Sequence, residues 1–239
     1  LKFYAGSREE LLPDFAPDFP YIASLVAMDC YPGRSAPWHW HGAVELSYTQ
    51  QGCMHYHTPG GVVFLPAGSA VLVNANVLHM TIAEPNTVQL LHIFEPSLLA
   101  APESRIETRY LAPLTAASQV EVLTLTPEDP AQAAVLEEIK KAFSLSPQDF
   151  GYEVRLRNAL SEVWLALLEQ AQPLLSAPCR QTKTSGQVKE MMAYIHEHFG
   201  EKLAVSDIAA AAFLSERECF RAFRECLHTT PVEYMKSYR

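Results

Sequence analysis

The sequence predicts an α+β protein of several domains: an N-terminal antiparallel β-barrel, then amphipathic helices, then an all-α helix-turn-helix. Three observations predict this order. Short apolar runs alternate with turn residues through residues 20–125, as in antiparallel sandwiches and barrels. After Pro130, apolar residues recur instead at three- and four-residue steps, the spacing of amphipathic helices. Beyond residue 187, two short helices are expected on either side of a tight turn.

Length and composition bound the class of protein. The chain has 239 residues, with 49% hydrophobic and 19% charged residues, which is ordinary for a soluble protein of two domains. It lacks an apolar run of about 18 residues, so we expect neither a transmembrane helix nor a membrane partner. No signal peptide is recognisable at Leu1–Ser7. The five cysteines are irregularly spaced, which indicates a reducing compartment and hence a cytoplasmic protein.

The predicted barrel covers residues 1–128. Its strands are expected in apolar runs at 21–28, 43–50, 62–65, 70–74, 88–94 and 120–125. Turn residues lie between these runs, among them Gly33, Gly52, Gly60 and Gly68.

Residues 129–172 are predicted to form two amphipathic helices. Apolar side chains at helical spacing run from Ala134 to Phe143 and from Val154 to Leu168. These apolar faces either cover the barrel or meet a second subunit, and we expect the segment to mediate a homodimer. Residues 173–186 carry two prolines and several small polar residues, which is typical of a linker.

Residues 187–239 are predicted to contain four helices. The first covers about 188–199 and the second about 205–212. The third begins at Ser215, which together with Glu218 forms a capping box, and the fourth begins at Thr230 with a second box. On the third helix, Cys219 and Phe223 are expected to face inward. The outward positions are expected to be Arg217, Arg221 and Arg224, with Phe220 near the boundary.

The third predicted helix is the second helix of the helix-turn-helix, and it carries the outward arginines. This arrangement favours double-stranded DNA as a partner, because arginine pairs with phosphates and guanine edges in the major groove. The alternative is a packed helical unit whose arginines are only solvated. Charge does not favour DNA: the chain carries −9, and residues 187–239 hold seven Lys and Arg against eight Asp and Glu. This part alone should therefore bind DNA weakly.

Histidines gather in the predicted barrel around His39-Trp40-His41. If the strand is regular, His39, His41 and Glu45 point to the same side, because even steps along a strand share a face. His79 can join them from a neighbouring strand. Three imidazoles and a carboxylate suit a divalent metal such as Zn, Ni, Fe or Mn. The alternative is a metal-free pocket in which these side chains only hydrogen-bond.

Other polar and aromatic residues are candidates for an effector pocket. Trp38, Tyr48 and His92 are placed on its wall together with the histidine cluster, although aromatic residues at barrel ends often serve only in packing. A second alternating pair, His55 and His57, is interpreted as part of a solvated hairpin.

Two families resemble these patterns. Gly33, His39, His41, Glu45 and Gly52 follow the spacing of the first cupin motif, which implies a cupin-like barrel; the second motif is only partly met, since Val71 stands where a histidine belongs. Residues 194–239 resemble the first half of the AraC-type DNA-binding domain. The matching stretches are 203–209, 213–217, 220–224 and 230–235.

The AraC/XylS resemblance implies a transcription regulator with a sensor barrel, in which the helix after Ser215 enters the major groove. It places Arg217, Phe220 and Arg221 at base contacts. The sequence departs from the family at Ala204, where a capping serine is usual. It ends at Arg239, so we expect only the first of two helix-turn-helix motifs.

Three functions remain open at this point. The first is a ligand-responsive regulator, not an enzyme, whose small-molecule effector changes the geometry of a DNA-bound dimer. The second is a metal-dependent cupin enzyme, a dioxygenase or isomerase, that uses His39, His41, Glu45 and His79. The third is a module whose end helices bind protein. The sequence does not identify the effector.

Overall fold

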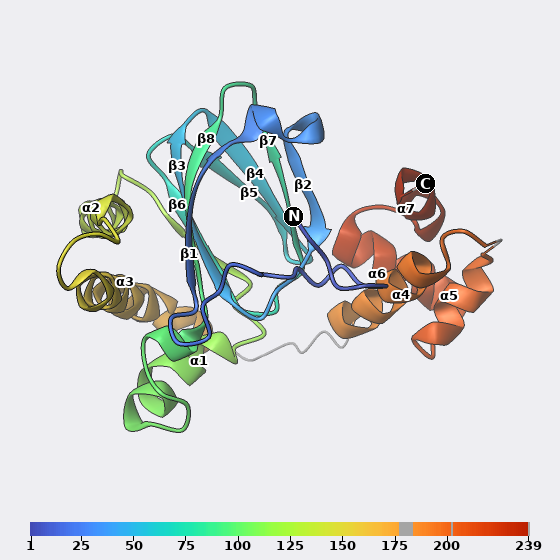
Figure 1. The fold of residues 1–239 in the computed structure, drawn as a ribbon. Coiled ribbons are helices and arrows are strands. Elements are labelled where there is room, and N and C mark those ends of the chain that lie inside the picture. Colours follow the sequence, from blue (N-terminus) through green and yellow to red (C-terminus); the bar gives the residue numbers. More distant parts are fainter. Residues whose placement is uncertain (177–183, 202, 239) are drawn as a thin grey trace.

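Two antiparallel sheets face each other in the N-terminal half of the chain (Figure 1). The computed structural model describes residues 1–176, 184–201 and 203–238. The strands within these residues are β1 (Tyr21–Ala27), β2 (Ser35–His39), β3 (Val44–Gln51), β4 (Cys53–Thr58), β5 (Gly61–Pro66), β6 (Ala70–Val73), β7 (His79–Ala83), β8 (Val88–Phe94) and β9 (Val122–Leu125). One sheet has the order β1-β8-β3-β6-β9 and the other β2-β7-β4-β5. The predicted antiparallel N-terminal unit is confirmed, as two facing sheets.

Alternate side chains along each strand point into the space between the two sheets. On β4, Met54 and Tyr56 are fully buried, whereas His55 and His57 lie on the other face. The inner side chains of both sheets form one apolar cluster, which comprises Met28, Met54, Tyr56, Leu65, Val71, Val73 and Ala83. At the turn between β3 and β4, Gly52 has φ +76°, and a Cβ there would lie 2.4 Å from Thr87 Oγ1. Only glycine fits this turn.

A helical segment interrupts the region that the sequence predicted as barrel only. A short helix at Glu107–Leu111 continues into α1 (Ala112–Thr115). Leu111 and Leu114 are buried against the helical layer, and the indole nitrogen of Trp164 donates to the carbonyl of Tyr110 at 2.8 Å. The range 1–128 that was assigned to the barrel therefore also contains helices, which lie between two of its predicted strands.

The helices α2 (Pro130–Ser144) and α3 (Tyr152–Leu175) cover the outer face of the five-stranded sheet (Figure 1). Asp129 caps α2 by accepting from the amide of Ala131 at 2.9 Å. Both predicted helices are present. α3 continues through Pro173, so the first residues of the predicted linker are helical, and residues 184–186 already belong to the next helix. Residues 177–183 lie outside the described part of the chain.

Four helices form the C-terminal unit: α4 (Thr184–His198), α5 (Val205–Ala211), α6 (Glu216–Leu227) and α7 (Pro231–Tyr238). Their inner faces pack in one cluster that also includes Trp38 of β2, Trp40 just after β2 and Leu78 just before β7. The helical unit therefore rests on one end of the four-stranded sheet. Among the helices that the structure describes, none combines the length and the apolar character needed to cross a membrane.

Candidate functional site

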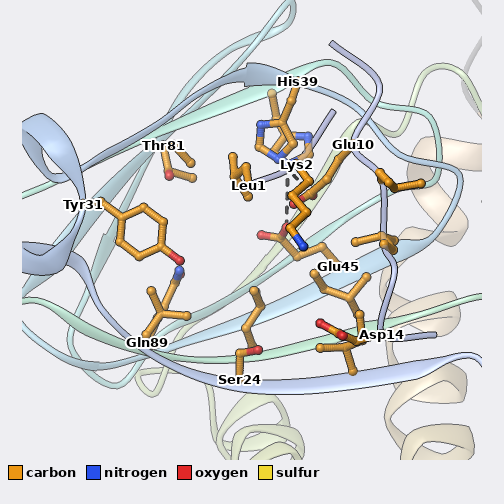
Figure 2. A pocket seen from close by; sticks show the side chains of 18 of the residues that line it. Leu1, Lys2, Glu10, Asp14, Ser24, Tyr31, His39, Glu45, Thr81 and Gln89 are labelled. Carbon is orange, nitrogen blue, oxygen red and sulfur yellow. Dashed lines mark ion pairs between the residues drawn. The ribbon is translucent and has the colours of Figure 1, made fainter. Parts of the chain in front are cut away.

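A cavity of about 280 Å³ lies between the two sheets, with side chains from both sheets and from the N-terminal segment in its wall (Figure 2). Its apolar part is formed by Ile22, Val26, Met28, Leu91 and Ile93. Its polar part includes Glu10, Ser24, His39, Glu45, Tyr56, His79, Thr81 and Gln89. The cavity therefore suits a small ligand with one apolar side and one polar or chelating end.

The predicted cluster is assembled at the polar end of this cavity. His39, His41, Glu45 and His79 are all buried, and one ligand atom from each lies within 4.8 Å of the others. Nε2 of His41 and Nε2 of His79 each lie 3.6 Å from Oε2 of Glu45. The rings of His39 and His79 are 4.1 Å apart.

The cluster forms by a different route from the one that the sequence suggested. His39 ends β2 and pairs directly with His79 on β7, whereas Glu45 lies on β3 in the opposite sheet. His41 lies in the connection between β2 and β3. The chain thus changes sheets between His39 and Glu45, so the condition of one regular strand is not met. The side chains meet because the two sheets face each other.

Backbone carbonyls orient all three imidazoles. Nδ1 of His39 lies 2.7 Å from the carbonyl oxygen of Pro37. Nδ1 of His41 lies 2.9 Å from the carbonyl oxygen of Ala43, and Nδ1 of His79 lies 2.9 Å from that of Val77. A neutral ring that donates through Nδ1 leaves Nε2 as an acceptor. In the described part of the chain, Nε2 of His41 and Nε2 of His79 are buried without a hydrogen-bond partner. A buried polar atom without a hydrogen-bond partner lowers the stability of the fold. A ligand bound to these two nitrogen atoms would remove that cost.

The charge of Glu45 is held by its neighbours. Burial by itself would raise the pKa of its carboxyl, but the imidazoles of His41 and His79 hold that pKa well below the ordinary value. The Tyr56 hydroxyl donates to Oε1 of Glu45 at 2.8 Å. Burial, then repulsion from His79 and His41, lowers the pKa of His39. The ionised carboxylate of Glu45 and the neutral ring of His39 are the forms of these side chains that bind metals.

The donor set fits a divalent transition metal. Metal–ligand bonds of about 2.0–2.2 Å place neighbouring donors roughly 3–4 Å apart. Three imidazole nitrogens and one carboxylate oxygen suit Zn, Fe, Ni or Mn, and the carbonyl contacts of the three rings are the outer-shell contacts expected of metal-binding histidines.

Two polar residues in contact with the cluster were missed at the sequence level. Tyr56 lies between His55 and His57, and the alternation of β4 could have identified it as the inward residue. Glu10 belongs to the N-terminal segment, and its Oε2 lies 3.7 Å from Nε2 of His39. Burial raises the pKa of the Glu10 carboxyl to about 7, an effect that His41 opposes. No motif surrounds Glu10 in the sequence.

Three residues predicted for the effector pocket face elsewhere. Tyr48 lies three residues after Glu45, an odd step, so its ring packs against the helical layer. His92 lies between two lining residues of β8 and points outward, where Nδ1 is 2.7 Å from the Tyr21 hydroxyl. Trp38 packs against the C-terminal helices. The prediction that Trp38, Tyr48 and His92 line the effector pocket is therefore corrected. Trp38 and Tyr48 serve in packing, which was the alternative given for aromatic residues at barrel ends.

The outer pair on β4 lies away from the cavity. His55 stacks beside Phe64 at 5.1 Å between ring centroids, and both His55 and His57 are half-buried on the outer face of the four-stranded sheet.

The second candidate site is the outer face of α6. Arg217, Arg221 and Arg224 are exposed, whereas Cys219 and Phe223 on the opposite side are fully buried. A shallow hollow on this face is lined by Arg217, Phe220, Arg221, Arg224 and Glu225. Together these positions form an exposed cationic face on a helix anchored from behind.

The capping box at the start of α6 is present. Ser215 Oγ accepts from the amide of Glu218 at 3.3 Å, and the Glu218 carboxylate accepts from the amide of Ser215 at 2.9 Å. The Ser215 hydroxyl also donates to that carboxylate at 2.7 Å. On α5, Asp207 accepts from the amide of Ala204 at 3.1 Å, so the aspartate supplies half of a box where the usual serine is missing. Phe213, in the turn between α5 and α6, is 95% exposed.

Contacts join the C-terminal unit to the sheets and to the N-terminal segment. The Lys189 ammonium donates to the carbonyl of Asn76 at 2.7 Å and lies 4.9 Å from the centroid of the Trp40 ring. Arg8 Nε donates to Nε2 of His196 on α4 at 3.4 Å. Burial, and then the Arg8 charge, lowers the pKa of His196 to about 3, so the neutral ring can accept.

Comparison with known proteins gives one curated relative in sequence and several solved structures of low similarity. The chain is 26% identical over 207 residues to YdeC of Bacillus subtilis (strain 168), named an uncharacterized HTH-type transcriptional regulator; this covers 85% of the chain and 70% of YdeC. Among solved structures, apo ToxT from Vibrio cholerae strain SCE256 gives a TM-score of 0.47 at 8% identity, with 90% of this chain and 97% of ToxT covered. The AraC-like transcriptional activator CuxR gives 0.36 at 11% identity, with 92% and 72% covered.

The two-sheet part of the chain matches a family model directly. The model of the AraC-like ligand binding domain matches residues 21–163, a range that contains both sheets and most of the helical layer. Since this is more than half of the 239 residues, the chain belongs to the family of the AraC-like ligand binding domain.

Proposed function

We propose that the chain is a ligand-responsive transcription regulator in which α6 reads double-stranded DNA and the cavity between the sheets holds the effector. The observation that carries this proposal is the two-sided character of α6. Its arginines are exposed, and its cysteines and Phe223 are buried in the helical core. A helix anchored from behind, with exposed arginines in front, can enter the major groove as a rigid unit.

Individual roles follow from positions on α6. Arg217 and Arg221 lie four residues apart and so share one face of the helix, where each can reach a guanine edge or a phosphate. Phe220 is half-buried beside them and can contact a thymine methyl group. Arg224 lies one turn from Arg221 and suits the backbone. Ser215 uses its hydroxyl in the cap, so its role is to fix the start of the helix at the DNA.

The N-terminal segment offers a route between the two sites. Glu10 lies in the cavity wall beside His39, and Arg8, two residues earlier, contacts α4 of the helical unit. A ligand that changes the position of this segment would change how the C-terminal unit is held. Such coupling requires only that the ligand has different affinities for the two arrangements.

We further propose a homodimer formed through the helical layer at residues 129–172. The outer side of α3 carries apolar residues that are not used against the sheet, since Val154 is 62% and Leu165 42% exposed. Phe150, just before α3, is 97% exposed. Such a regulator would act in the cytoplasm.

Selection of DNA sequences by the full chain tests the proposal. Random duplexes are passed over the protein at low salt, and the recovered sequences are compared with those recovered by Arg217→Ala/Arg221→Ala. We expect one enriched motif with the unaltered chain and none with the double variant. Equal enrichment with both proteins, or no enrichment with either, contradicts DNA reading by α6.

A metal-dependent cupin enzyme is the second candidate, because the cluster of His39, His41, Glu45 and His79 offers a complete donor set. Bound there, a metal would supply Lewis-acid or redox chemistry to a ligand in the cavity. Metal analysis after mild purification, followed by a screen for substrate turnover, separates the candidates. Turnover that is lost in Glu45→Gln would favour the enzyme, whereas metal content below about 0.1 per chain would remove it, since the proposed chemistry needs a bound ion.

A further inference from the structure

The N-terminal segment is fastened beside the histidine cluster by its backbone. Glu9 forms a parallel bridge with Trp40. The amide of Glu10 donates to the carbonyl of Trp40 at 2.7 Å, and the amide of Trp40 donates to the carbonyl of Arg8 at 3.2 Å. Because Trp40 lies between His39 and His41, this pairing places residue 10 directly next to the cluster.

The Glu10 side chain uses this position to point at the cluster (Figure 2). Its side chain is 8% exposed, and Oε2 lies 3.7 Å from Nε2 of His39. This separation matches the 3.6 Å that joins Glu45 to His41 and to His79. Glu10 therefore adjoins the group of four through His39, at the spacing of about 3–4 Å expected between neighbouring donors of one ion.

Charge also favours a cation between the two carboxylates. The side chains of Glu10 and Glu45 are each 8% exposed, and both lie in the wall of the same cavity. Within the part of the chain that the structure describes, the ion pairs of both carboxylates are with histidines alone. A divalent cation compensates the charge of two carboxylates that are largely removed from solvent.

We propose that Glu10 is a fifth protein ligand of the divalent cation held by His39, His41, Glu45 and His79, so that the cation fastens the N-terminal segment over the cavity. This inference rests on the four-residue metal site that the second candidate function uses. A set of three nitrogens and two oxygens exceeds the four ligands typical of zinc and suits the higher coordination of Mn, Fe or Ni.

The test measures metal affinity in the full chain with Glu10→Gln and with Glu9→Gln as the matched control. Glu9 is the adjacent residue of the same segment, carries the same charge and lies outside the cluster. Mn²⁺ and Ni²⁺ are titrated in competition with a chelating dye. We expect Glu10→Gln to lower the affinity by about tenfold or more, as loss of a metal contact does. Glu9→Gln should stay within about twofold of the unaltered chain, because it removes no ligand.

Cleavage by trypsin after Arg8 gives a second readout that does not depend on affinity. Saturating metal should slow cleavage in the unaltered chain and in Glu9→Gln, and should have no effect in Glu10→Gln. Matching circular dichroism spectra of the three proteins establish that each is folded.

The outcomes separate this inference from the metal site beneath it. If the unaltered chain binds metal and Glu10→Gln binds it equally tightly, with equal protection at Arg8, Glu10 is not a ligand and the four-residue site stands. If the unaltered chain binds neither metal, the four-residue site fails and the inference fails with it. Either result leaves DNA reading by α6 to its own test.

Discussion

The cavity cluster and the outer face of α6 handle charge in opposite ways. In the cavity, three imidazoles and a carboxylate are almost completely buried, and each ring is fixed through Nδ1 to a backbone carbonyl. On α6, three arginines are exposed on one side of a helix whose other side is core. The first arrangement suits a small ligand whose own polar atoms take the place of water at each buried imidazole and at the carboxylate. The second suits a large polyanion that meets mobile side chains in water.

This difference implies that the two regions respond to different changes. A single lost donor in the cavity leaves buried partners without compensation, so its effect should be large and independent of salt. A single lost arginine on α6 removes one of several screened contacts, so its effect should be moderate and dependent on salt.

The largest expected effect follows His41→Ala. Removal of this imidazole deletes one donor and leaves Glu45 with one imidazole fewer, so we expect the affinity for divalent metal to fall by about 100-fold or more. Isothermal titration with Mn²⁺ and Ni²⁺ measures this loss. His55→Ala, on the outer face of β4, is the control and should bind like the unaltered chain. Retained affinity in His41→Ala would show that the cluster is a hydrogen-bonded pocket without metal.

The next effect is that of Arg221→Ala on DNA. If the guanidinium reads a base, the substitution costs about 1–3 kcal/mol on the selected site and less on a scrambled duplex. Fluorescence anisotropy with both duplexes measures the difference. Arg105→Ala removes the same charge from an exposed position before α1 and should leave the specific affinity unchanged. An equal loss in both variants would mean that only net charge matters.

A smaller effect is expected for Ser215→Ala. The substitution removes the side-chain acceptor for the Glu218 amide, and loss of such a cap costs about 0.5–2 kcal/mol. Hydrogen exchange of the amides in the first turn of α6 measures this cost locally. Ser215→Asp keeps an acceptor at the cap and should restore protection. Unchanged exchange in Ser215→Ala would show that the core alone fixes the start of the helix.

The smallest effect concerns salt. Each phosphate contact contributes about 0.9 to the slope of log affinity against log salt concentration, so Arg224→Ala should reduce the slope by about 1 while sequence preference remains. Anisotropy titrations between low and moderate salt give the slope. The metal affinity of the same protein should not change with salt, because its ligands are buried. A slope unchanged in Arg224→Ala would place this arginine away from the phosphates.

Much of the fold could be predicted because local patterns determined it. The strand β8 and the capping boxes at Ser215 and Thr230 are where apolar runs and capping residues indicated. The helix at Glu107–Leu111 could not be identified in this way, since the hydrogen bond to its Tyr110 carbonyl comes from Trp164, 54 positions later.

The site was predicted in part. Histidine spacing identified the four cluster residues, although the regular strand on which that reasoning was conditioned is absent. Strict alternation would have excluded Tyr48, which is an odd step from Glu45, and His92, which lies between two cavity-lining residues. Glu10 was beyond reach, because its proximity to His39 arises from pairing of the N-terminal segment with Trp40, a contact that no local pattern encodes.

The central claim is that one molecule links an occupied cavity to DNA reading by α6. Its most direct test is the affinity of the full chain for the selected duplex, measured by anisotropy with Mn²⁺ or Ni²⁺ and again after removal of metal by a chelator. The account predicts specific binding that differs between the two states by about fivefold or more, the scale of a coupling of 1–3 kcal/mol, and no difference in His41→Ala. No preference for the selected duplex over a scrambled one in either state would contradict the account.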